Sequence, residues 1–308
     1  MNENILQTRQ LGKRYGKRWA VKNLNLEVHR GDVFGFLGPN GAGKSTTIRM
    51  ILSLIQPTIG ETELFGYPLK YRRSDALRRV GGIVEKPDFY LYLSAYKNLQ
   101  IIGALTGGAD RKRIMEVLDL VGLVHRASDR VKTYSHGMKQ RLGIAQALLS
   151  DPELVILDEP TNGLDPQGMK EVRELIVHLS RDQKKTIILS SHLLNEIELV
   201  ANRMVIINYG ELVVQGEVSK LLDEGEKYVV IKANPQEKVR SVLRQQKKYI
   251  RKYEIKEGIF EVQMDFADIP ELNKGLVRAG VHVQALIPKR SLEDLFLSMT
   301  EHSIEARS

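Results

Sequence analysis

The chain has 308 residues, of which 42% are hydrophobic and 27% are charged, and its formal net charge is +8. This length and composition suit an ordinary globular protein with one large domain or two unequal ones. Cysteine is absent from the sequence, which excludes disulfides, thiolate metal sites and a cysteine nucleophile.

No apolar run approaches the roughly 20 residues that cross a bilayer, and the N-terminus lacks the charged-then-apolar order of a secretory signal. We therefore expect the chain to stay in the cytosol. Almost all of the excess positive charge falls in residues 1–222. It suits an anionic partner such as a nucleotide, a nucleic acid or the inner membrane leaflet. A charged surface that only keeps the protein soluble explains it equally well.

Strand and helix patterns alternate along the first 222 residues. Strands are predicted over residues 21–28, 32–38, 78–85, 153–160, 186–192 and 204–210. Helices are predicted over residues 44–54, 95–105, 110–122 and 193–202, and another follows the polar octapeptide YSHGMKQR at residues 134–141. This alternation predicts an α/β fold with a mostly parallel sheet covered by helices on both faces.

The pattern changes in residues 223–308. Strands are predicted over 227–234 and 281–287, a hairpin over 253–264, and helices over 235–247 and 269–280. The order β-α-β-β-α-β predicts a small α+β domain of ferredoxin-like type, followed by a short helix over 291–300.

The segment GPNGAGKST matches the phosphate-binding pattern G-x-x-x-x-G-K-[ST], and it lies between a predicted strand and a predicted helix. Its residues are Gly38, Pro39, Asn40, Gly41, Ala42, Gly43, Lys44, Ser45 and Thr46. Glycines allow backbone N–H groups to face phosphate oxygens, and the helix N-terminus adds partial positive charge. We expect Lys44 to reach the β- and γ-phosphates of a nucleotide and Ser45 to be a Mg²⁺ ligand.

Polar residues follow two further predicted strands. Asp158 and Glu159 end the apolar strand LVIL, at the edge where ligands collect in such sheets. We expect Asp158 to hold Mg²⁺ and Glu159 to act as general base on the attacking water. His192 ends a second strand and is a candidate contact to the γ-phosphate and the water. Tyr15, in an exposed basic stretch, is a candidate platform for adenine.

Five segments in this order, GPNGAGKST, YSHGMKQR, LVILDEP, NGLD and SSH, resemble the ATPase subunit of an ABC (ATP-binding cassette) transporter. The resemblance covers residues 1 to about 222 and implies a P-loop NTPase cassette with a helical subdomain at about 86–150. In that family the octapeptide closes over ATP held by a second subunit. By resemblance, Ser135 and Gly137 contact the partner's γ-phosphate, and Asp165 crosses the same interface.

The sequence departs from the family pattern at several positions. Tyr134, His136 and Met138 replace the first, third and fifth residues of the usual signature, while Ser135 and Gly137 remain. Glu85 stands where the family commonly has a glutamine that contacts Mg²⁺ and the membrane partner, an exchange that resembles bacitracin- and lantibiotic-type peptide exporters. Glu85 is therefore a candidate Mg²⁺ ligand, and a solvated strand-end residue is an equal alternative.

The resemblance implies an ATPase subunit, with ATP and Mg²⁺ as cofactors, that drives export of a peptide antibiotic, drug or lipid-like molecule. It implies two kinds of partner: separate membrane-spanning permease subunits, and a second cassette subunit with which the chain forms a homodimer. It also implies a place on the cytoplasmic face of the membrane, and no nucleic acid is expected as a partner. Alternatives are an ATPase of a non-export membrane complex such as gliding machinery, and a soluble cassette acting on ribosomes or DNA. Residues 223–308 resemble an exporter accessory domain, whose basic segment 238–252 contacts lipid headgroups or is a solvated helix face.

Overall fold

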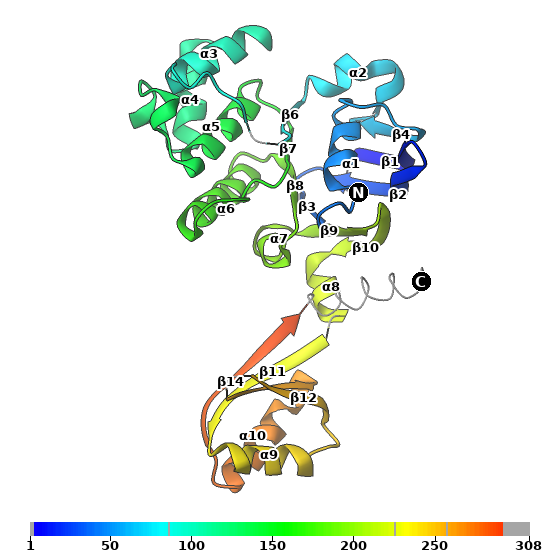
Figure 1. Ribbon diagram of the computed structural model, residues 1–308, viewed down its shortest axis with the longest axis vertical. Helices are drawn as coiled ribbons and strands as arrows, with labels where there is room; N and C mark the ends of the chain where they lie inside the picture. The colour runs from blue at the N-terminus through cyan, green and yellow to red at the C-terminus, as the bar shows by residue number, and fades with distance from the viewer. Residues whose placement is uncertain (1–2, 86, 225, 257, 292–308) are drawn as a thin grey trace. The chain divides into compact units, whose positions relative to one another are not determined.

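The computed structural model describes residues 3–85, 87–224, 226–256 and 258–291. Contacts divide the chain into two compact units, Met1–Val218 and Ser219–Ser308 (Figure 1). The division falls four residues before the boundary expected at residue 222.

The first unit contains a six-stranded sheet and a four-stranded antiparallel sheet. In spatial order the six strands are β10 (Glu211–Glu217), β9 (Arg203–Asn208), β3 (Val33–Leu37), β8 (Thr186–Ser191), β7 (Leu154–Leu157) and β6 (Val80–Ile83). The four strands of the other sheet are β2 (Arg18–His29), β1 (Asn4–Tyr15), β4 (Ile59–Leu64) and β5 (Tyr67–Pro68). Strands β9, β3, β8, β7 and β6 run parallel to their neighbours, and β10 pairs with β9 as an antiparallel hairpin.

The central strands β3, β7 and β8 are buried along their whole length. Strands of a parallel sheet are covered on both faces, so their sequences are nearly continuous apolar runs rather than alternating ones. This is the pattern that the sequence shows in VFGFL and LVIL. Their carboxyl ends therefore meet at one edge of the sheet, inside a rigid apolar frame.

Helices cover this sheet and form a separate block in the same unit. They are α1 (Lys44–Ile51), α2 (Leu69–Leu77), α3 (Ala95–Leu105), α4 (Arg111–Leu120), α5 (His136–Leu148), α6 (Pro166–Arg181) and α7 (Leu194–Val200). Helix α8 (Val218–Glu224) begins at the last residue of this unit, and its other residues belong to the second unit. Figure 1 shows α3, α4 and α5 gathered on one side of the six-stranded sheet, with the antiparallel sheet on the other side. Side chains of Ser94, Asp110, Ser135 and Asp165 cap the N-termini of α3, α4, α5 and α6.

The second unit has the element order expected for residues 223–308. It contains β11 (Glu226–Asn234), α9 (Gln236–Gln245), β12 (Ile250–Lys256), β13 (Ile259–Met264), α10 (Ile269–Arg278) and β14 (His282–Ser291), and the strand order is β12-β13-β11-β14. All neighbouring strands are antiparallel. Alternate strand residues such as Val229 and Val262 pack against Val239 and Leu272 of the two helices. The helix expected over 291–300 lies outside the described residues.

Candidate functional site

The loop after β3 has a backbone that only glycine fits at its most crowded points. Gly41 and Gly43 have φ angles of 81° and 108°, which L-residues with side chains rarely adopt. A Cβ added to Gly43 would lie 2.5 Å from the carbonyl oxygen of Ala20, and one added to Gly38 would lie 2.5 Å from that of Ile207. The loop therefore packs closely against neighbouring backbone before it enters α1.

Lys44, the first residue of α1, is turned into this loop. Its side chain is only 5% exposed, and Nζ donates a hydrogen bond of 2.7 Å to the carbonyl oxygen of Gly38. Nζ also lies 3.2 Å from Oε1 of Glu159. Because a buried ammonium is costly without partners, the carboxylate and the loop carbonyl together stabilise Lys44 at the site.

The two carboxylates after β7 have different surroundings. Asp158 is buried, and the hydroxyl of Ser190 donates a hydrogen bond of 2.5 Å to its Oδ1. The backbone N–H of Glu159 donates a hydrogen bond of 2.8 Å to Oγ of the same serine, and Glu159 has a φ angle of 48°. Ser190, on the neighbouring strand β8, thus fixes both residues. Sequence reasoning missed it, since a serine inside an apolar strand carries no motif.

His192 follows β8 and reaches the second oxygen of the glutamate. Its Nδ1 lies 2.8 Å from Oε2 of Glu159. Strand β8 lies between β3 and β7 in the sheet, so Lys44, Glu159 and His192 come from three adjacent strand ends. The structure therefore joins them in one chain of contacts, with Glu159 at its centre.

The other candidate oxygen donors lie on or beside α1. Ser45 and Thr46 are half-buried in its first turn. The carboxylate of Glu85 forms an ion pair with Arg49, one helical turn beyond Ser45, and is 66% exposed. Among the described residues there is no group of three or more His, Cys, Asp or Glu side chains arranged to hold a metal ion.

Tyr15 lies at the end of β1 and exposes its ring. The ammonium of Lys13 lies 5.4 Å from the ring centroid, within the range of a cation–π contact. An exposed aromatic face beside a positive charge is suited to stacking on a base of an anionic nucleotide.

The octapeptide leads into α5, with Ser135 and His136 exposed and Gln140 buried. Ser135 is exposed, and its Oγ accepts a hydrogen bond of 3.2 Å from the backbone N–H of Met138. In the described part of the chain, outside its own helical turn, the atom nearest to a Cβ added to Gly137 would be Cα of Gly168, 3.9 Å away. Tyr134 anchors the turn, because its buried hydroxyl donates a hydrogen bond of 2.6 Å to the carbonyl oxygen of Arg126. Burial raises the pKa of Tyr134 to about 12.

The turn before α6 lies beside the octapeptide. Nδ1 of His136 is 3.2 Å from the carbonyl oxygen of Gly163. Asp165 is exposed and accepts a hydrogen bond of 2.9 Å from the backbone N–H of Gly168, as the N-cap of α6. The structure thus places Ser135, Gly137 and Asp165 on two neighbouring helix starts.

Comparison with known proteins identifies the family. A family model described as ABC transporter matches residues 21–162. The bacitracin transport ATP-binding protein BcrA of Bacillus licheniformis is 44% identical over 297 residues, covering 96% of this chain and 97% of that protein. The chain belongs to the ATP-binding proteins of ABC transporters. The BcrA protein of Enterococcus faecalis is 37% identical over 296 residues, which cover 96% of each chain.

Solved structures agree with this assignment of the ABC ATPase. The structure of cbiO1 from Clostridium perfringens, part of the ABC transporter complex cbiONQ, matches with a TM-score of 0.66 and 28% identity, over 80% of this chain and 97% of that one. The ATP-binding cassette MJ0796, solved as a dimer in a post-hydrolysis state with ADP and Pi, matches with a TM-score of 0.62 and 25% identity, over 69% and 98%. The expected cassette fold is therefore confirmed.

As a member of this family, the ABC ATPase binds ATP and couples its hydrolysis to transport. The loop at residues 38–46 has the glycine residues and the backbone conformation that phosphate binding requires. None of the helices in the described part of the chain is both long and apolar enough to cross a membrane.

Proposed function

We propose that this ABC ATPase powers the export of a peptide antibiotic, or of a drug or lipid-like molecule, through separate membrane-spanning subunits. Two observations support the substrate class. Relatives that match nearly the whole chain are named for bacitracin transport. Glu85 also replaces the glutamine that is common in other cassettes. The subunit then works as a peripheral protein on the cytoplasmic face of the membrane.

The contact chain from Lys44 through Glu159 to His192 carries the catalytic proposal. The loop of residues 38–46 binds the phosphates, Lys44 neutralises the β- and γ-phosphate oxygens, and Tyr15 stacks on adenine. Glu159 accepts a proton from the water that attacks the γ-phosphate. His192 orients the Glu159 carboxylate and stabilises charge on the γ-phosphate oxygens.

The residues at the site fit a bound Mg²⁺ ion. Mg²⁺ prefers oxygen ligands and commonly takes one or two from a carboxylate or hydroxyl and others from substrate phosphates. The hydroxyl of Ser45 and the carboxylate of Asp158 would hold the ion. Glu85 would be a further ligand if its ion pair with Arg49 opened. Bound Mg²⁺ neutralises charge on the phosphate oxygens during transfer.

Ser135, Gly137 and Asp165 would act on ATP bound by a second copy of the chain. The exposure of Ser135 and Asp165 supports this role, because both side chains are accessible to another molecule. Space around Gly137 allows a phosphate to approach the backbone. The partially positive N-terminus of α5 would stabilise the γ-phosphate charge. A complete site then requires two chains in head-to-tail arrangement.

A surface near residues 85–100 would receive the permease subunit. Tyr90, Leu91 and Tyr92 are exposed before α3, and the rings of Tyr90 and Tyr92 contact each other edge-to-face with centroids 6.1 Å apart. The side chain of Asn98 holds this segment, accepting a hydrogen bond from the N–H of Tyr90 and donating one to its carbonyl oxygen. Exposed aromatic residues on a rigid support suit a protein interface.

Affinity purification of the tagged ABC ATPase from its own cells tests the proposal. We expect a multi-spanning membrane protein to co-purify, and its deletion together with the ATPase to increase sensitivity to a peptide antibiotic. Lys44→Ala should weaken ATP binding and reproduce the sensitivity. Recovery of ribosomes or DNA instead would contradict transport, and a membrane partner without any change in drug sensitivity would contradict export.

A further inference from the structure

A buried ion pair joins the two helices that follow the catalytic strand ends. Arg173 of α6 donates a hydrogen bond of 2.7 Å from Nη1 to Oε1 of Glu196 on α7. The glutamate side chain is only 4% exposed and that of Arg173 is 24% exposed. The other carboxylate oxygen, Oε2, is buried and has no hydrogen-bond partner among the described residues.

This pair is poorly explained by stability alone. Burial of a carboxylate costs free energy, and a single hydrogen bond on one oxygen recovers only part of it. Replacement of buried ion pairs by apolar residues is often neutral or stabilising, whereas a buried pair imposes one specific geometry. The position of Glu196 in the chain indicates what that geometry controls.

Helix α7 begins at Leu194, two residues after His192, and Glu196 lies in its first turn. The next residue of α7, Ile197, packs on β3, the strand that leads into the phosphate loop. Ile197 is fully buried there, and a Cβ added to Gly35 would lie 2.3 Å from its Cγ2. Helix α7 is therefore held both by β3, through Ile197, and by Arg173, through Glu196.

Helix α6 starts at the N-cap Asp165, in the turn that contacts the octapeptide. It therefore connects the surface proposed to meet a second chain with Arg173, which lies two turns along the helix. We propose that the Arg173–Glu196 ion pair positions His192, by fixing α7 against α6 so that the imidazole stays on Glu159. The inference rests on the proposed catalytic function, and it makes Arg173 and Glu196 positioning residues.

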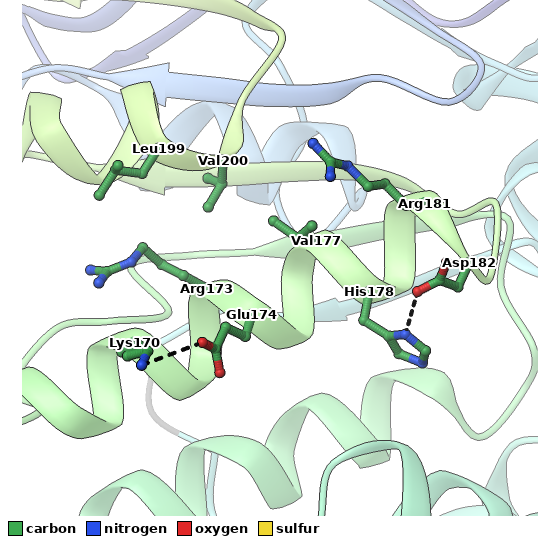
Figure 2. A pocket seen from close by; sticks show the side chains of 9 residues that line it. All are labelled: Lys170, Arg173, Glu174, Val177, His178, Arg181, Asp182, Leu199 and Val200. Atoms are coloured by element: carbon green, nitrogen blue, oxygen red, sulfur yellow. Dashed lines mark hydrogen bonds and ion pairs between the residues drawn. The ribbon is translucent and has the colours of Figure 1, made fainter.

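The same surface supplies a matched control. Arg173 lines a groove of about 590 Å³ between α6 and α7, and Arg181 lines it two turns further along α6. Figure 2 shows both arginines on α6, with Leu199 and Val200 contributed by α7. The side chain of Arg181 has no hydrogen bond or ion pair with any residue in the described ranges. Substitution of Arg181 thus removes the same charge from the same groove without touching Glu196.

The test compares Arg173→Met, Arg173→Lys and Arg181→Met in the assembled transporter. We expect Arg173→Met to lower kcat about tenfold while KM for ATP changes less than twofold, because the phosphate loop is intact. Arg173→Lys should restore most of kcat, and Arg181→Met should match the wild type. If Arg173→Met does not fold, Glu196→Gln takes its place, since it removes the charge with nearly unchanged shape.

A second measurement needs no turnover. The ¹⁵N shifts of the His192 ring in the isolated chain should move, in Arg173→Met, toward those of Glu159→Ala, which lacks the contact. Equal kcat values and ring shifts in Arg173→Met and Arg181→Met would overturn the positioning role. A wild-type transporter without ATP turnover would instead overturn the proposed function, so the two failures are distinguishable.

Discussion

Nδ1 of His192 lies 2.8 Å from Oε2 of Glu159, although the two residues belong to different strand ends. The remaining oxygen of the glutamate is held by Lys44 at 3.2 Å. Both carboxylate oxygens of Glu159 are therefore engaged by side chains of the protein itself. The phosphates of a bound nucleotide would compete with Glu159 for Lys44. If Lys44 moved to the phosphates, Oε1 of Glu159 would be able to accept a proton, while His192 would keep Oε2 in place.

Glu159→Gln should lower the rate of ATP hydrolysis by about a hundredfold to ten-thousandfold, the usual contribution of a general base. The amide retains the shape and one acceptor oxygen, so ATP binding should persist. Phosphate release by the assembled transporter and equilibrium binding of a fluorescent nucleotide measure the two effects. Unchanged turnover would falsify the assignment of Glu159.

Gly137→Ala should leave the fold intact and still abolish ATP-dependent dimerisation. Among the described residues beyond its own helical turn, the atoms nearest to the added methyl group lie 3.9 Å away or more, so we expect the partner's nucleotide to be the obstacle. Gly143→Ala in the same helix is the matched control. Its Cβ would lie 2.8 Å from Cγ of Pro87, and it should lower Tm. Sedimentation with ATP and thermal unfolding separate the two; normal dimers of Gly137→Ala would contradict the shared site.

Ser190→Ala should destabilise the chain by about 1–3 kcal/mol, because Asp158 loses its donor and the N–H of Glu159 loses its acceptor in a buried place. Turnover should fall as well, since both carboxylates lose their common support. Ser74→Ala, at an exposed serine of α2, controls for loss of a hydroxyl. Urea unfolding measures the difference, and equal midpoints for the two variants would show that Ser190 is dispensable.

Glu153, the residue before β7, gives a pH-dependent contribution to stability. A hydrogen bond of 2.8 Å from Arg79, assisted by one of 2.6 Å from Arg30, lowers the pKa of Glu153 from 4.5 to about 2. A carboxyl group with a lower pKa in the folded state stabilises that state above its unfolded pKa, and the effect is lost as the pH falls through the folded pKa. The gap in unfolding free energy between wild type and Glu153→Gln should therefore be full above about pH 4.5 and shrink toward pH 2. A gap independent of pH across this window is the contrary result.

The parallel strands and the phosphate loop could be predicted because their signals are local. An apolar run that ends in glycine, followed by Lys44 at a helix start, fixes strand, loop and helix within about 20 residues. The start of α6 was also visible, since Asp165-Pro166 precedes Val172, Leu175, Ile176 and Leu179 at helical spacing. That helix was not predicted. An N-cap residue followed by proline and by apolar residues at helical spacing is a standard sequence signal for a helix.

Other features depend on contacts that no local pattern shows. Strand β1 was not predicted, because pairing shifts between Thr8 and Leu11, where Gln10 has a φ angle of 47°, interrupt the alternation of buried residues. Ser190 reaches Asp158 and Glu159 across more than 30 residues of sequence. The ion pair of Glu85 with Arg49 likewise arises only when α1 and the end of β6 meet.

Ser135 is exposed, whereas Lys44 is buried in the phosphate loop, a different segment of the chain. This arrangement has a consequence for mixtures of two inactive variants. A chain with Lys44→Ala keeps a sound octapeptide, and a chain with Ser135→Ala keeps a sound phosphate loop. In a dimer that contains one chain of each kind, one of the two ATP sites combines the intact phosphate loop of the Ser135→Ala chain with the intact octapeptide of the Lys44→Ala chain. The other site carries both substitutions. Mixing the two inactive variants should therefore restore part of the ATP hydrolysis, because each active site is formed by residues of two chains.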